Sequence, residues 1–157
     1  MMTNYKGDME NQGDIERLTS NVGSLMARAG RLSNRHYGGL LEPLGLTPAQ
    51  ATILGVLEAR GESAVGELAD IWRVKAPVVT PMVGGLVRLG YVERWLDPED
   101  GRRSILAVTE LGRRVLVEVG VVQREALERT TAGFEKEEVE RLEDYLRRVI
   151  EALEREV

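Results

Sequence analysis

The sequence predicts a mostly α-helical protein with one small β-hairpin. Long segments near both ends repeat apolar residues every three or four positions, as one face of an α-helix does. Helix start and stop signals divide the stretch between them into short helices. From residue 91 the period changes to the alternation of β-strands, with a turn-rich cluster between two such runs. At 157 residues the chain has the size of one ordinary domain.

A long N-terminal helix is expected over residues 14–45. It should end near Glu42, because a residue that precedes proline avoids the helical region. Residues 1–13 are polar and lack periodicity, so we expect a flexible tail there. The apolar side chains that recur at helical spacing are Ile15, Leu18, Val22, Leu25, Met26, Ala29 and Leu32.

The next helix has a clear start. Thr47 is a good N-cap, Pro48 suits the first turn, and Gln50 stands three residues after the cap, where it closes a capping box. Gly61 suits the left-handed position after the helix ends.

Two more short helices follow. Ser63 is expected to cap a helix that reaches Trp72. After a link at residues 73–75, a helix over 76–89 has Pro77 in its first turn and Gly90 after its end. Its inward stripe is expected to be Val79, Val83, Leu86 and Leu89.

Residues 91–96 and 104–108 are expected to form the two strands of a hairpin. The cluster Asp-Pro-Glu-Asp-Gly at 97–101 lies between them. Asp100 and Gly101 are expected to supply the positive φ angles that tight hairpin turns use.

The C-terminal segment, 109–157, is expected to form two helices separated by a break at 131–133. Thr109 should cap the first of them. Like the N-terminal helix, these helices have apolar faces with little to cover inside one small domain. We therefore expect both terminal regions to form a dimerisation region with a second copy of the chain.

Helices followed by a two-stranded hairpin constitute a winged helix-turn-helix, here at residues 46–108. The second helix of the pair, 76–89, can enter a DNA major groove as a recognition helix. The hairpin tip, 97–104, is the wing, and Arg102 and Arg103 at this tip are suited to the negative potential of a minor groove. Two subunits would present two recognition helices to a two-fold DNA site.

Four segments carry a known pattern: LTPAQATIL (46–54), GELA (66–69), LVRLGYVER (86–94) and DPEDGRRSILAVTELGRR (97–114). Together they resemble the MarR family of bacterial and archaeal transcription regulators, over about residues 14–156. The resemblance implies a homodimer that binds pseudo-palindromic promoter DNA, usually as a repressor, and that is often released by a small phenolic or other anionic ligand. It also gives Arg102 the role of the wing arginine in the minor groove, and Asp100 that of the partner that shapes the wing.

The predicted recognition helix departs from the common pattern of the family, which often has serine, arginine or aspartate on the outward face. Here the expected outward positions are Pro77, Val78, Pro81, Gly84, Gly85 and Arg88. The candidate DNA-binding residues are Ser63, Lys75, Val78, Thr80, Pro81, Arg88, Asp100, Arg102 and Arg103. Candidates for a ligand cleft between the winged helix and the dimer helices are His36, Tyr37 and Trp72.

The composition excludes several classes of protein. There is no cysteine and only one histidine, His36, so thiol chemistry, disulfides, cysteine-bound metal sites and histidine-rich metal clusters are excluded, and no metal or cofactor is expected. No glycine-rich phosphate loop follows a strand, and we expect no enzyme. Without a secretory signal or a long apolar run, the expected location is cytoplasmic, away from membranes.

Net charge leaves a second interpretation open. The whole chain has a net charge of −5, although residues 68–104 carry six basic and five acidic side chains. The alternative to a DNA reader is a winged-helix protein-interaction module without sequence-specific DNA binding, and the apolar recognition helix favours it.

Overall fold

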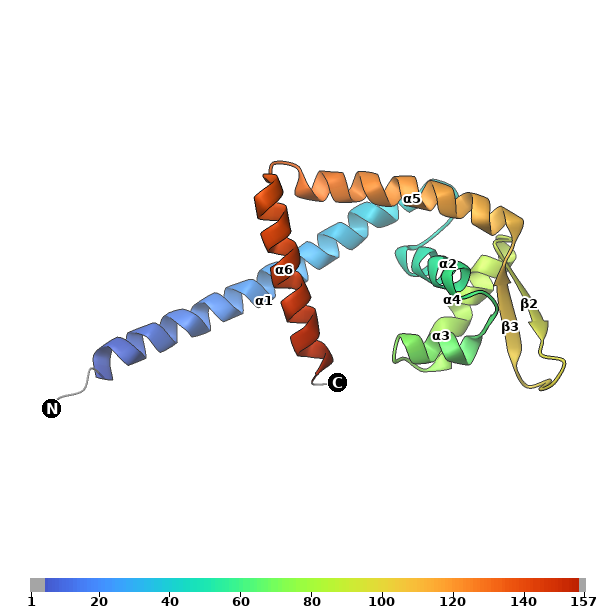
Figure 1. The fold of residues 1–157 in the computed structure, drawn as a ribbon, viewed down its shortest axis with the longest axis horizontal. Helices are drawn as coiled ribbons and strands as arrows, with labels where there is room; N and C mark the ends of the chain where they lie inside the picture. The colour runs from blue at the N-terminus through green and yellow to red at the C-terminus, as the bar shows by residue number, and fades with distance from the viewer. Residues whose placement is uncertain (1–4, 156–157) are drawn as a thin grey trace.

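The computed structural model describes residues 5–155, and the side chains of residues 17–155. A compact helix-and-hairpin unit lies at one end of the molecule, and the long helices α1, α5 and α6 lie beside and beyond it (Figure 1). This arrangement confirms a mostly α-helical winged helix-turn-helix with long terminal helices.

Helix α1, Tyr5–Leu41, is 37 residues long and spans about 55 Å at ~1.5 Å per residue. Residues 5–13 belong to it, so the expected tail is wrong for that stretch, and residues 1–4 lie outside the described part of the chain. Adding residues to an existing helix is far less costly than starting one, which explains how a polar segment extends it. The helix ends at Leu41, beside Glu42 as predicted, and a 3₁₀ turn, Glu42–Leu44, follows it.

The helices of the winged-helix unit are α2 (Pro48–Arg60), α3 (Val65–Ile71) and α4 (Ala76–Arg88). The capping box of α2 is confirmed. The Gln50 N–H donates to Thr47 Oγ1 at 3.3 Å, and the Thr47 N–H donates to Gln50 Oε1 at 3.0 Å. Gly61 follows α2 with φ +80°, and its N–H donates to the Leu57 carbonyl.

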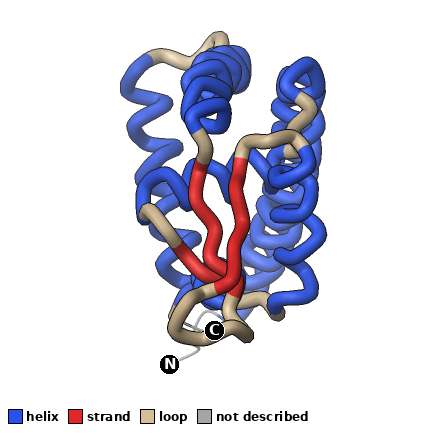
Figure 2. The backbone as a smooth tube through the Cα atoms, turned by 90° about the vertical axis from the view of Figure 1, so that its right-hand side faces the viewer, coloured by secondary structure: helices blue, strands red, loops and turns tan. Residues whose placement is uncertain are grey.

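Strands β1 (Ser63–Ala64), β2 (Val92–Leu96) and β3 (Ser104–Val108) form an antiparallel sheet in the order β1-β3-β2. Figure 2 shows the two long strands side by side with the short one next to them. The sequence did not predict β1, and Ser63 is not an N-cap. Its backbone pairs opposite Leu106, and α3 begins two residues later, with Glu67 Oε2 accepting the Ala64 N–H at 2.9 Å.

One apolar core joins the sheet to the helices. The side chains with the least exposure are Leu41, Ile53, Leu54, Leu57, Leu68, Val79, Val83, Leu86, Val92 and Leu106. The predicted inward stripe of α4 is therefore confirmed at three positions, while Leu89, its fourth member, is 36% exposed.

The connection between β2 and β3 differs from the predicted tight turn. Neither Asp100 nor Gly101 has a positive φ. The loop is wider and is held by carboxylates instead: Asp97 Oδ1 accepts the Glu99 N–H at 2.9 Å, and Asp100 Oδ1 accepts the Arg102 N–H at 3.0 Å. These hydrogen bonds let the chain reverse without the left-handed residues that a two-residue hairpin needs.

Helices α5 (Glu110–Thr131) and α6 (Lys136–Glu154) complete the chain. Thr109 caps α5 as predicted, its hydroxyl oxygen accepting the Gly112 N–H at 3.0 Å. Gly133, with φ +93°, stands in the predicted break. Helix α5 packs along α1, whereas α6 has no buried residue.

No single helix in the described part of the chain is long and apolar enough to cross a membrane. Two consecutive segments of this part, Arg17–Leu44 and Pro48–Arg60, are long and apolar enough only when taken together, and they are bent by 72° relative to each other.

Candidate nucleic-acid interface

Helix α4 presents an exposed, largely apolar face to solvent. Pro77, Val78 and Pro81 are exposed, Val78 at 49%. Pro81 stands inside the helix and lacks the N–H that would bond to the carbonyl of residue 77. Gly85, which was expected to point outward, is buried, so that expectation is wrong.

Gly84 and Gly85 have different surroundings. A Cβ atom at Gly85 would overlap Nε2 of Gln50 from α2, which donates to the Met82 carbonyl at 3.5 Å. Gly85 thus permits the close approach of two helices inside the protein. A Cβ at Gly84 would meet only Nη1 of Arg88, at 3.8 Å, so the guanidinium of Arg88 lies back over this part of α4.

The polar groups on the solvent face of α4 are few. The Thr80 hydroxyl donates to the Ala76 carbonyl at 2.8 Å, within its own helix. Lys75 stands at the N-cap position without a side-chain cap. Neither Lys75 nor Arg88 forms an ion pair with a side chain that the structure describes, so both cations are available to an external anion.

Arg102 and Arg103 have distinct environments on the wing. Arg103 Nη2 lies 2.7 Å from Glu67 Oε1, and its Nη1 lies 3.9 Å from Asp97 Oδ2. Arg103 therefore ties the wing to α3. The guanidinium of Arg102 has no ion-pair partner among the described side chains, and only its backbone N–H is bound, by Asp100.

An open hollow of about 510 Å³ lies between α3, α4 and the wing. It brings Thr80 of α4 together with Arg102 and Arg103 of the wing. Arg94, which the sequence analysis did not single out, also lines it and donates to Ser104 Oγ at 2.8 Å. Strand alternation gives Arg94 the same face of β2 as the buried Val92, so periodicity alone could not identify it as a surface residue.

Ser63 does not take part in this surface. It is 4% exposed, and its hydroxyl donates to the Gly61 carbonyl at 3.2 Å. A buried hydroxyl with an internal acceptor is not presented to an external phosphate. The hairpin loop and α3 lie on the same side of the unit, away from α5 (Figure 1).

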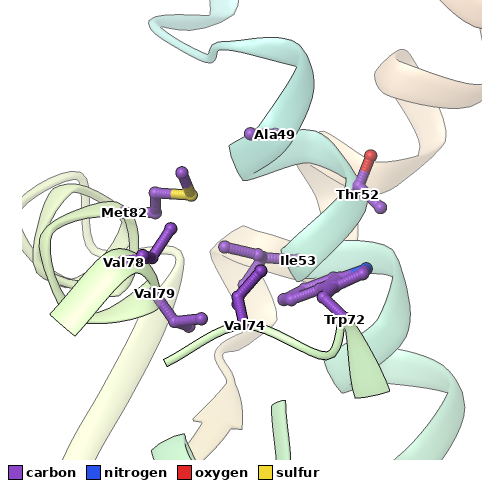
Figure 3. Close-up of a pocket in the computed structure, with 8 residues that line it drawn as sticks. All are labelled: Ala49, Thr52, Ile53, Trp72, Val74, Val78, Val79 and Met82. Carbon is purple, nitrogen blue, oxygen red and sulfur yellow. The ribbon is translucent and has the colours of Figure 1, made fainter. Parts of the chain in front are cut away.

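The three candidate ligand residues do not converge on one cleft. Trp72 lines an apolar hollow of about 230 Å³ between α2 and α4, together with Ile53, Val74, Val78 and Met82 (Figure 3). Tyr37 and His36 instead line two separate hollows of about 310 Å³ each, where α1 lies along α5.

Burial raises the pKa of the Tyr37 phenol. The Nε2 atom of His36 is buried and has no hydrogen-bond partner among the described residues. No group of three or more histidine or acidic side chains within residues 17–155 is arranged to hold a metal ion.

Known proteins are similar to this chain in sequence and fold. The family model described as MarR family matches residues 44–103. The HTH-type transcriptional repressor IacR of Pseudomonas putida is 30% identical over 115 residues, which cover 73% of this chain and 69% of that protein. The multiple antibiotic resistance protein MarR of Escherichia coli is 25% identical, over 90% of this chain and 99% of that protein.

Solved structures of MarR proteins are similar to this chain in fold. A mutant of E. coli MarR complexed with operator DNA is 26% identical to this chain, with a TM-score of 0.73 over 82% of this chain and 93% of that one. A MarR transcriptional regulator from Methanosarcina mazei shares the fold, with a TM-score of 0.77, 21% identity, and coverage of 88% and 99%. The sequence segments, the winged-helix geometry and these relatives lead to one conclusion: the chain belongs to the MarR family of winged helix-turn-helix transcription regulators.

Proposed function

We propose that this chain is a homodimeric, DNA-binding transcription repressor that recognises a pseudo-palindromic promoter site through α4 and the wing. The observation that carries the proposal is the position of the unpaired Arg102 guanidinium beside the exposed face of α4. This face also has unpaired cations near both ends, at Lys75 and Arg88. Such a surface offers phosphate contacts on either side of a helix of groove-filling size.

Dimerisation accounts for the exposed apolar side chains of the long helices. On α1 these include Leu18, Val22, Leu25 and Leu32, and on α6 they include Leu142, Leu146, Ile150 and Leu153, each between 38% and 64% exposed. Large contiguous apolar surfaces are rare on monomers. Two copies of the chain would cover them and would place two α4 helices on one duplex.

The direction of regulation and the effector belong to the same proposal. Repression is supported by the name of the P. putida relative, a transcriptional repressor. A small aromatic or anionic effector would fit beside Tyr37 and His36, where α1 meets α5, because a molecule held there contacts both of these long helices.

Substitution of Arg102 tests the DNA-binding proposal. Arg102→Ala is expected to weaken binding to a duplex selected from a random pool tenfold or more, which is about 1.4 kcal/mol. Arg124→Ala removes an exposed arginine from α5 and serves as the matched control, with little change expected. Unchanged affinity of an intact Arg102→Ala dimer would contradict the role of the wing.

A protein-interaction module remains the second candidate, favoured by the apolar surface around Val78 and Val74, which are 49% and 38% exposed. The two functions differ in their response to salt. The logarithm of a DNA affinity falls linearly with the logarithm of the salt concentration, because counterions are released on binding. An apolar protein contact lacks this dependence.

A further inference from the structure

We infer that this chain selects its DNA site largely through the methyl groups of thymine, contacted by Val78, Pro77 and Pro81 of α4. The inference rests on the proposed DNA-binding function and names the chemistry by which the site is read. It follows from what the solvent face of α4 offers, and from what it lacks.

Hydrogen-bond readout of bases needs free donors or acceptors in the middle of the recognition helix. The Thr80 hydroxyl donates its proton to the Ala76 carbonyl, so it offers a base no donor and only the acceptor lone pairs of its oxygen. Pro77 and Pro81 have no side-chain polar atom, and Gly84 has no side chain. The only long polar side chain on this face is Arg88, in the last turn of α4. The centre of the helix therefore presents hydrocarbon.

In the major groove, an apolar side chain can recognise one specific apolar group on the base edges, the methyl group of thymine. Among the four base pairs, only those with thymine present a methyl group at that edge, and apolar side chains recognise it by contact. The three apolar side chains lie within five consecutive residues, a little more than one helical turn, so they can face neighbouring base pairs. The next position on this face, Gly84, has no side chain, and the Arg88 guanidinium lies beside it.

The surroundings of this apolar strip favour DNA over a protein partner. Unpaired cations border it at Lys75 and Arg88, and Arg102 lies across the adjoining hollow. Glu67, an acidic residue of that hollow, is neutralised by Arg103 at 2.7 Å. An apolar centre flanked by cations matches a thymine-containing groove between phosphate backbones.

Deoxyuridine differs from thymidine only by this methyl group, so it isolates the contact. We take the duplex selected by this protein, replace thymine with deoxyuridine at one symmetric pair of positions at a time, and measure Kd at fixed salt. Each lost methyl contact is expected to weaken binding about fourfold, from ~0.8 kcal/mol for one buried carbon. A symmetric pair is then expected to cost roughly fifteenfold.

A double-mutant cycle assigns the contact to its side chain. Val78→Ala is expected to weaken binding to the thymine duplex and to abolish the difference between thymine and deoxyuridine at one pair of positions. Val78 is half-exposed, so the variant should fold. Val117→Ala, which removes a 72%-exposed valine of α5, is the matched control and should keep the full difference. Pro81→Ala, which regains a helical N–H, tests a second position.

The possible outcomes distinguish a failure of methyl readout from a failure of the proposed DNA-binding function. Sensitivity to deoxyuridine that Val78→Ala removes supports methyl readout. Tight, salt-dependent binding that is unchanged by deoxyuridine at every position overturns the inference but leaves the proposed function intact. Failure to bind any duplex overturns both, and then assigns the apolar strip to a protein partner.

Discussion

Gly112 packs the start of α5 against the base of the β2–β3 hairpin by a contact that no other residue allows, and its replacement is a sharp test of the fold. A Cβ added there would overlap the carbonyl oxygen of Tyr91 and would lie 3.0 Å from its carbonyl carbon and 2.8 Å from Cγ1 of Val108. The atoms it meets are mostly backbone, which cannot rotate away. The same carbonyl oxygen accepts the Thr109 N–H at 3.0 Å.

The cost of Gly112→Ala follows from these contacts. Overpacking at a tight site costs about 1–3 kcal/mol, and displacement of α5 weakens the Thr109 hydrogen bond, worth about 1 kcal/mol. Alanine recovers about 1 kcal/mol of helix propensity over glycine. We expect a net loss of about 2 kcal/mol in the free energy of unfolding.

Gly120→Ala is the control on the same helix. A Cβ at Gly120 meets nothing within 4 Å, so this variant should gain about 1 kcal/mol. Urea unfolding followed by circular dichroism, at one fixed protein concentration, measures both variants. If Gly112→Ala is as stable as Gly120→Ala, the close contact between the start of α5 and Tyr91 is wrong.

Three further variants test other parts of the molecule. Glu67→Gln removes the ion pair with Arg103 but can keep an acceptor for the Ala64 N–H. Because both side chains of the ion pair are about half exposed, urea unfolding should show that the free energy of unfolding falls by less than about 1 kcal/mol. This difference should vanish in ~1 M salt. Burial raises the pKa of Tyr37 above its ordinary 10.0, so the folded state retains the phenol proton more tightly than the unfolded state does. The protein therefore loses stability as the pH rises past about 10. Tyr37→Phe should reduce the loss of stability measured between about pH 9 and 11. The double variant Leu25→Glu, Leu146→Glu places charges in the expected dimer interface, so sedimentation should show monomers. A persistent dimer would place the interface elsewhere.

The sequence predicted those parts of the fold that depend on local signals. The caps at Thr47 and Thr109, the break near Gly133, and the two long strands all follow from residues within a few positions of each other. The caps form hydrogen bonds within their own helix ends, and the two long strands are close in sequence, so periodicity and capping chemistry suffice to find them.

What the sequence did not predict depends on contacts between distant segments. Strand β1 has two residues and exists because Ser63 pairs opposite Leu106. Gly85 is buried because Gln50 of α2 lies against it. Arg103 faces Glu67, 36 positions earlier in the chain, which separates its role from that of Arg102. Periodicity cannot reveal such pairs.

The most direct test of the central claim is selection of bound duplexes from a random DNA pool at near-physiological salt. A dimer that reads thymine methyl groups should enrich an inverted repeat, rich in thymine at the positions nearest α4, with half-site centres about 34–36 Å apart or a multiple of this spacing. A folded dimer that enriches no sequence would contradict the central claim.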